Sequence, residues 1–315
     1  MSAHETETLS DAEHASFEHP PFEHPMDNII VRPLDFEVEK LEPSQVVWSE
    51  TSPEFAIYLN AFGVHVPYFE RYLIRSMSTA KKHVTDERLR ADMSAITGQE
   101  AHHAKNFLTF NKLLADRYPR VSELDERARK YFTEHAKTDS LKKLVGFTAG
   151  YETFTFLAGM IILANYEKWM QDSDPAIKAL WVWHQVEEVE HGAVAFEVYK
   201  ELFGDHEWYR KYMILIALTH IGKEALAAYF HMAKVEGYFK NPVSAVKATW
   251  FVFATFGQMV WHSLPTFSSR YHPRVHPLAT TKQNKIAVAW RRYLKKGGDV
   301  LTIDRAKMKE IIGFG

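Results

Sequence analysis

Two Glu-x-x-His pairs constrain the fold of this 315-residue chain more than any other feature. The first pair is Glu100 with His103, and the second is Glu188 with His191. Residues i and i+3 lie on one face of an α-helix, so each pair can aim a carboxylate and an imidazole at one point. Pairs of this kind also occur by chance, so further residues must decide whether they form a site.

A single glutamate precedes each pair in an apolar segment. Glu70 is the only acid in residues 55–85, and Glu152 is the only acid in residues 140–166. A buried carboxylate without a partner costs several kcal/mol, and a bound metal ion would compensate its charge. The alternative for each glutamate is a surface position or an ion pair with an arginine such as Arg71.

The positions of the expected turns support a metal site. About halfway between each single glutamate and the following pair lies a helix-start signal, Thr85-Asp86 in the first case and residues 172–175 in the second. Two helices joined by a turn at the midpoint bring their ligands to the same level. Two Glu-x-x-His pairs with two single glutamates form a set that holds two metal ions in a four-helix bundle.

The helix around the second pair has more polar residues than the ligand set requires. His184 and Glu187 lie within about 100° of Glu188 and His191 on the helix surface. We expect His184 and Glu187 to have catalytic roles beside the ligands, by orienting them or by moving protons. Glu190 points away from this face, so we expect it to be exposed to solvent and its replacement to matter little.

The spacing of apolar residues and the capping signals predict an all-α fold. We expect a ferritin-like four-helix bundle with a crossover helix and additional C-terminal helices. The expected bundle helices are 52–82, 86–116, 140–171 and 175–202, the crossover is 122–135, and the later helices are 207–234, 242–264 and 284–296.

The chain divides into three expected parts. Residues 1–45 form a disordered or extended arm, residues 46–270 a ferritin-like metal-binding domain with added apolar helices, and residues 271–315 an extension with a basic helix. In the arm, the Phe-Glu-His-Pro repeats at 17–20 and 22–25 contain prolines that break helices. No secretory signal is visible, so the cytoplasm is the expected compartment.

The composition limits the chemistry and the partners. The chain has no cysteine, so it has neither disulfides nor thiolate ligands, and histidines and carboxylates must bind any metal. A formal net charge of −2 gives no general attraction to nucleic acid, which we exclude as a partner. A small, hydrophobic molecule is the expected partner, and a homodimer is compatible with the sequence.

One apolar stretch raises the question of a membrane. Residues 248–269 contain no Asp, Glu, Lys or Arg, and this length is enough to span a bilayer. We favour a buried helix that covers the bundle, with a membrane-embedded or membrane-surface helix as the alternative. Before this stretch, His220 and Glu224 lie one turn apart, and we expect them to form a buried hydrogen-bonded pair.

These motifs together resemble the bacterial family of predicted metal-dependent hydrolases, which looks like a member of the wider ferritin-like di-iron carboxylate group. The likeness covers roughly residues 45–270, and its most specific motif is His-Gly-Ala-Val-Ala-Phe at 191–196. Phe69 and Phe107 stand where the family pattern leads us to expect a glycine and a histidine. The other matching segments are 65–71, 98–103, 106–111, 148–152 and 183–184. The resemblance implies a metal-dependent hydrolase with the metal ligands Glu70, Glu100, His103, Glu152, Glu188 and His191.

The residues leave the reaction open. Four glutamates and two histidines suit two iron ions that activate O2, with manganese or zinc as alternative metals. We favour this reaction on an apolar or amphipathic small molecule, because aromatic residues of the later helices could line a pocket. The alternative is hydrolysis by a metal-bound hydroxide, as the resemblance implies. Iron storage and a membrane-associated structural role are further alternatives.

Overall fold

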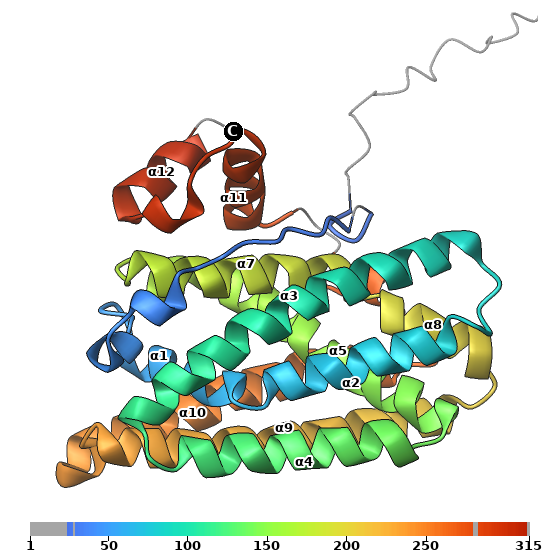
Figure 1. The fold of residues 1–315 in the computed structure, drawn as a ribbon, viewed down its shortest axis with the longest axis horizontal. Helices are drawn as coiled ribbons and strands as arrows, with labels where there is room; N and C mark the ends of the chain where they lie inside the picture. Colours follow the sequence, from blue (N-terminus) through green and yellow to red (C-terminus); the bar gives the residue numbers. More distant parts are fainter. Residues whose placement is uncertain (1–23, 28, 280–282, 314–315) are drawn as a thin grey trace, which may run out of the picture.

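The computed structural model describes residues 24–27, 29–279 and 283–313. These residues form helices and connecting loops, with one isolated β-bridge between Ser49 and Ser173, so the predicted all-α fold is confirmed (Figure 1). Most of the predicted N-terminal repeat, including residues 17–23, lies outside the described residues. The α-helices are α1 (Pro53–Gly63), α2 (Val66–Ala80), α3 (Glu87–Arg117), α4 (Val121–Thr138), α5 (Leu141–Ala164), α6 (Tyr166–Trp169), α7 (Pro175–His191), α8 (Val194–Phe203), α9 (Glu207–Val235), α10 (Pro242–Ser263), α11 (Lys285–Lys295) and α12 (Arg305–Gly313).

Capping side chains start the ligand helices close to the predicted positions. Asp86 accepts a hydrogen bond from the backbone N–H of Leu89 at the start of α3. Asp174 caps α7 in the same way, with Pro175 in the first turn, and Ser140 caps α5. The turns before α3 and α7 therefore fall where the sequence predicted them.

Two of the expected helices are interrupted near the predicted ligands. The expected helix 52–82 is divided into α1 and α2, and the expected helix 175–202 is divided into α7 and α8. The second break begins at Gly192, where a Cβ atom would lie 2.6 Å from the ring of Phe156. A glycine at this position therefore permits a close approach between α5 and the end of α7.

The helices with the predicted ligands pack as two hairpins (Figure 1). α2 packs against α3, and α5 packs against α7. Contacts of α2 with α5 and of α3 with α7 join the hairpins, and α4 crosses from the end of α3 to the start of α5 along α2. One predicted ligand segment thus lies on each of four mutually packed helices.

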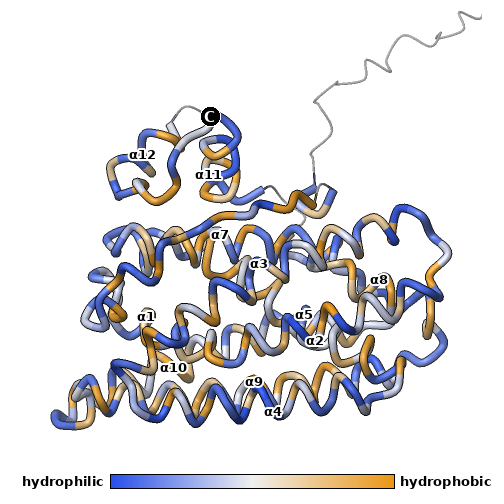
Figure 2. The backbone as a smooth tube through the Cα atoms, viewed as in Figure 1, coloured by the Kyte–Doolittle hydropathy of each residue, from blue (hydrophilic) through white to orange (hydrophobic). Residues whose placement is uncertain are grey.

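The crossover helix α4 has one buried face. Its buried residues recur at helical spacing, as in a helix that packs on a core with one side. Figure 2 shows the same alternation of hydrophobic and hydrophilic residues along the outer helices. The buried residues of α4 are Val121, Leu124, Ala128 and Phe132.

α9 and α10 add a further layer to the bundle. α9 packs on α1 and α5, at the edge opposite to α7 (Figure 1). α10 also packs on α1 and α5, and it buries Ala248, Val252 and Met259. Only 22% of the most apolar part of Pro242–Phe267 is buried, so our expectation of a buried covering helix at 242–264 is wrong.

The C-terminal helices form a small pair beside α7. α11 and α12 contact one another, and the side chain of Trp290 is buried between them and the bundle. We did not expect α12 from the sequence. The N-terminal arm runs between this pair and the bundle, along α7 and α3 (Figure 1).

Gly150 on α5 tests the packing of the bundle against α9. A Cβ atom there would lie 2.7 Å from the backbone carbonyl oxygen of Met213, which cannot turn aside. We expect Gly150→Ala to lower the free energy of unfolding by about 1–3 kcal/mol, measured from the urea midpoint. The control is Gly257→Ala in α10, where a Cβ atom meets nothing within 4 Å and helix propensity favours alanine. Equal midpoints for the two variants would contradict the close contact between α5 and α9.

Candidate metal centre

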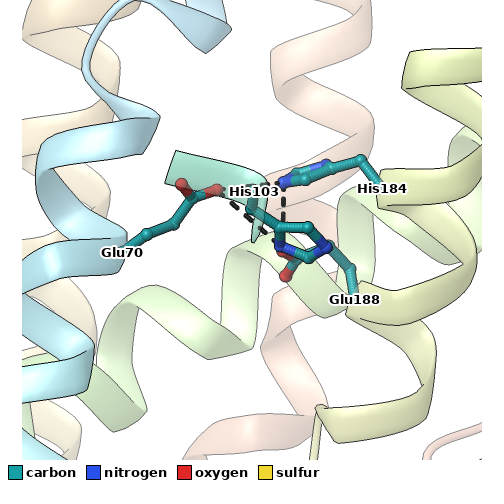
Figure 3. Close-up of side chains that lie close together, drawn as sticks. All are labelled: Glu70, His103, His184 and Glu188. Atoms are coloured by element: carbon teal, nitrogen blue, oxygen red, sulfur yellow. Dashed lines mark ion pairs between the residues drawn. The ribbon is translucent and has the colours of Figure 1, made fainter. Parts of the chain in front are cut away.

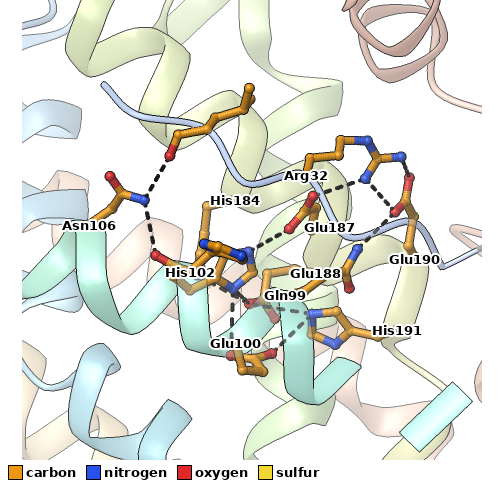
Figure 4. Close-up of polar contacts among 12 residues, drawn as sticks. Arg32, Gln99, Glu100, His102, Asn106, His184, Glu187, Glu188, Glu190 and His191 are labelled. Carbon is orange, nitrogen blue, oxygen red and sulfur yellow. Dashed lines mark hydrogen bonds and ion pairs between the residues drawn. The ribbon is translucent and has the colours of Figure 1, made fainter. Parts of the chain in front are cut away.

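All six predicted metal ligands are buried in the core of the bundle. Each is at most 2% exposed, although four of the six are glutamates. They come from α2, α3, α5 and α7. Figures 3 and 4 together show the residues other than Glu152 converging on one region between the two hairpins. The buried residues are Glu70, Glu100, His103, Glu152, Glu188 and His191.

One group of side chains that could hold an ion comprises Glu70, His103, His184 and Glu188 (Figure 3). The Nε2 atom of His184 lies 3.1 Å from Oε1 of Glu188 and 3.4 Å from Oε1 of Glu70. The Nδ1 atom of His103 lies 3.7 Å from Oε1 of Glu188 and 3.8 Å from Oε1 of Glu70. Side-chain atoms from three helices therefore face a common point.

A second group adjoins the first and comprises Glu100, His103, Glu188 and His191. The Nε2 atom of His191 lies 3.1 Å from Oε1 of Glu100 and 3.8 Å from Oε1 of Glu188. The Nδ1 atom of His103 lies 3.5 Å from Oε2 of Glu100. The two groups overlap at His103 and Glu188. The carboxylate of Glu188 can bridge two neighbouring cations, whereas the one imidazole nitrogen of His103 that faces the cluster can bind only one of them.

The polar atoms that face these two positions lack hydrogen bonds. Facing pairs approach within 3.1–3.8 Å, but their groups are not aligned as donor and acceptor. Buried polar atoms normally have partners, and leaving them without one is costly. Metal ions would satisfy all of them, so the donor set fits metal binding. The unpartnered atoms are both carboxylate oxygens of Glu70 and of Glu100, Oε2 of Glu188, Nδ1 of His103, and Nε2 of His184 and of His191.

Glu152 and His184 occupy different places from those the sequence led us to expect. Oε2 of Glu152 accepts a hydrogen bond of 2.8 Å from Nδ1 of His191, and Glu152 belongs to neither group. His184, expected beside the ligands, lies inside the first group. The structure thus brings five of the predicted ligands together directly and relates Glu152 to the cluster through His191.

Glu187 orients His103 from behind. Oε2 of Glu187 lies 3.0 Å from Nε2 of His103, which leaves Nδ1 of the imidazole directed at the cluster. Oε1 of Glu187 accepts a hydrogen bond of 3.0 Å from Arg32 of the N-terminal arm (Figure 4). This is the orienting position that we expected for Glu187, and metal-binding histidines usually need such a partner.

The structure contradicts our expectation that Glu190 is exposed to solvent. It is 1% exposed, and the guanidinium of Arg32 donates two hydrogen bonds of 2.8 Å to its carboxylate. Gln99 and Arg291 donate further hydrogen bonds of 3.2 Å. The expectation failed because the arm and α11 cover the outer side of α7, which would otherwise face water. The one signal in the sequence is Arg32 itself, a lone charge in the apolar run 29–34.

The ionisable groups of the cluster affect one another strongly. Burial raises the pKa of Glu70 to about 7 and that of Glu152 to about 8. Burial acts to lower the pKa of His191, but the carboxylates of Glu188 and Glu152 raise it to about 10. Burial likewise opposes protonation of His103, whose pKa is nevertheless raised by the adjacent carboxylates of Glu100 and Glu187. Protons therefore neutralise part of the buried charge, and a metal ion that binds must displace them.

Aromatic rings exclude water from one side of the cluster. The ring of Trp183 meets His103 edge-on with centroids 4.6 Å apart, and Phe107 meets His184 in the same way at 4.8 Å. Phe107 is one of the two residues that depart from the expected family pattern. Its apolar ring at this position supports His184 by packing, since it has no donor or acceptor to offer.

The predicted pair of His220 and Glu224 is not formed. Glu224 binds Arg127 of α4 at 2.5 Å, and Nδ1 of His220 is hydrogen-bonded to the hydroxyl of Tyr151. Both residues are therefore satisfied by other helices. They connect α9 to α4 and α5 rather than to each other.

Comparison with known families agrees with the geometry. Residues 30–280 match the model of a family described as predicted metal-dependent hydrolase. The chain belongs to this family. The comparisons with curated proteins and with solved structures each gave no match. Membership of this family identifies the protein as a predicted metal-dependent enzyme. The buried clusters of glutamate and histidine are able to hold the metal.

Replacement of Glu188 tests the assignment of the metal ligands, because Glu188 belongs to both groups of candidate ligands. We expect Glu188→Gln to remove most of the bound metal while the helical circular dichroism stays unchanged, since glutamine keeps the volume but loses the charge. Metal per chain is measured by elemental analysis after purification without a chelating tag. The control is Glu87→Gln on α3, whose side chain is 91% exposed. Equal metal content in both variants would remove Glu188 from the centre.

Glu190 tests the arginine network. Glu190→Ala leaves the buried guanidinium of Arg32 with one carboxylate fewer, so we expect the free energy of unfolding to fall by about 3–5 kcal/mol. Glu126→Ala is the control, because Glu126 forms an exposed pair with Arg129 and such pairs contribute little to stability. Urea midpoints measure both. A loss in Glu190→Ala no larger than in the control would show that the network adds no stability.

Proposed function

We propose that this protein is a dimetal carboxylate enzyme that activates O2 and acts on an apolar or amphipathic small molecule. The proposal is supported chiefly by the two adjoining groups, which meet at the carboxylate of Glu188. A carboxylate shared between two neighbouring positions is typical of sites that hold a pair of ions. A single structural ion would require only one of these groups.

The donor set is compatible with iron, whose redox chemistry suits the proposed activation of O2. Carboxylates and imidazoles suit iron, manganese and zinc, and the chain has no thiolate to select a softer metal. Two iron ions would supply the electrons with which O2 is reduced. Every donor lies in the core of the bundle, where water has little access. Iron is therefore our first choice, with manganese or zinc as alternatives.

The residues around the donors have separate tasks in this proposal. Glu187 holds the hydrogen on Nε2 of His103, so that Nδ1 remains free for a metal ion. Glu152 holds the hydrogen on Nδ1 of His191, so that Nε2 is directed at the second position. Glu152 can exchange this proton with His191, because the two groups are in direct contact. His184 completes the first position, close to Glu70.

A cavity beside the arginine network supports an amphipathic substrate. It has a volume of about 540 Å³ and is lined by Arg32, Glu190, Arg291 and Lys295, among others. Cationic side chains of this kind bind the carboxylate or phosphate group of a small molecule. The cavity lies on the outer side of α7, and Arg32 connects it to His103 through Glu187. The exposed aromatic residues of α10 do not line a pocket at the centre, contrary to our expectation.

Hydrolysis is the second candidate, and the description of the family favours it. The same two positions filled by zinc or manganese would lower the pKa of a water molecule and so provide a nucleophile. The residues of the centre serve either reaction. The metal and its response to O2 distinguish the two.

The test is metal content together with reaction with O2. We expect the protein loaded anaerobically with iron to bind about two ions per chain and to develop a new near-ultraviolet absorption on exposure to air. Glu188→Gln should lose this response, and Glu87→Gln should keep it. Bound zinc or manganese, no response to O2 and turnover of ester substrates would instead establish hydrolysis. Absence of bound metal under all loading conditions would overturn both candidates.

A further inference from the structure

The exposed side of α10 is strongly apolar. It presents large hydrophobic side chains along the whole helix and into the turn that follows it. Trp250 is 74% exposed and Trp261 is 69% exposed, although tryptophan is usually largely buried. The exposed residues are Val243, Val246, Trp250, Phe253, Trp261 and Leu264, at 52–76% exposure.

α9 extends this surface. Trp208 is 84% exposed, and Tyr212 and Leu215 follow it at helical spacing with about half of each side chain exposed. Phe230 of α9 joins the two helices, since its ring lies 6.3 Å from that of Phe253. We call the exposed residues of both helices, from Trp208 to Leu264, the α9–α10 face. A large amount of exposed apolar surface of this kind normally marks a binding site.

The two helices of this face lie against the helical bundle. Both α9 and α10 are long and apolar enough to cross a membrane, yet each packs one side on α1 and α5. Half of the most apolar part of α9 is buried by these contacts. A helix fixed along a folded core in this way can contact a membrane only with its outer side. This geometry is that of a surface-bound protein.

The charges around the face are mostly positive. Lys223, Lys234 and Lys240 are exposed beside it, and α10 contains Lys247 but no acid. Lys247 is 68% exposed, although it reaches Glu54 at 2.7 Å. The acids of α9 and of its C-cap are engaged by basic residues: Glu207 by Lys200 and Arg210, Glu224 by Arg127, and Glu236 by Arg117.

An anionic membrane complements this surface better than a second copy of the chain. Tryptophan and tyrosine favour the boundary between lipid and water, and lysines beside an apolar face are attracted to anionic head groups. A symmetric dimer through the same face would bring the lysines of both copies together. We infer that the α9–α10 face binds the surface of a membrane that contains anionic phospholipid. The inference does not depend on the metal or on the reaction.

The test is cosedimentation of the full-length protein with lipid vesicles. We expect binding to vesicles of phosphatidylglycerol and phosphatidylcholine, and binding at least about tenfold weaker to phosphatidylcholine alone. The double variant Trp250→Gln/Trp261→Gln should weaken binding to the mixed vesicles at least about tenfold. Circular dichroism and metal content should stay unchanged, because neither side chain belongs to the core.

Two controls make the result specific. Val275→Gln replaces a side chain that is 62% exposed outside the α9–α10 face, and it should bind like the unmodified protein. Lys223→Glu/Lys234→Glu should weaken binding to the mixed vesicles only. Unchanged binding of the double tryptophan variant would overturn the inference. So would failure of the unmodified protein to bind vesicles, and a dimer abolished by the tryptophan changes would then assign the face to a second copy.

Discussion

The burial of several carboxylates in one apolar core is the constraint on which the rest of the structure depends. Glu70, Glu100, Glu152 and Glu188 are nearly inaccessible to water, and like charges in such an environment need compensation. Histidines of α3 and α7 supply part of it, and the remaining unpartnered atoms face one another as metal ligands would. On the outer side of α7, Arg32 does the same for Glu187 and Glu190. The position of the N-terminal arm follows from this requirement.

The sequence predicted the helices well where local chemistry decides their ends. Asp86 and Asp174 cap α3 and α7 because their side chains bind free backbone N–H groups, and such signals can be read locally. The breaks after α1 and α7 could not be read in this way. At Gly192 the cause is the ring of Phe156 on another helix, and a glycine in a helical pattern does not reveal what will approach it. Tertiary contacts therefore decided what local propensity left open.

The candidate site shows the same division. The spacing of Glu-x-x-His pairs and single glutamates located the buried cluster, because helical periodicity and turn positions determine which residues share a level. Whether Glu152 or His184 faces the cluster depends on the direction of each side chain. The spacing of residues along the sequence does not specify these directions. Glu190 was misplaced because its partner Arg32 lies 158 residues away in the chain. A helical face shows only that a side chain points away from the ligands, and the arm that covers it comes from elsewhere.

The apolar helices raise a related problem. α5 and α10 are similarly hydrophobic, but 78% of the most apolar part of α5 is buried against 22% for α10. Hydropathy measures how strongly a segment avoids water and does not identify the apolar phase that receives it. For α5 this apolar environment is made by neighbouring helices, among them α9 and α10. The same helix directs Glu152 to His191. A membrane on the outer side of α10 would therefore be separated from the proposed centre by α10 and α5.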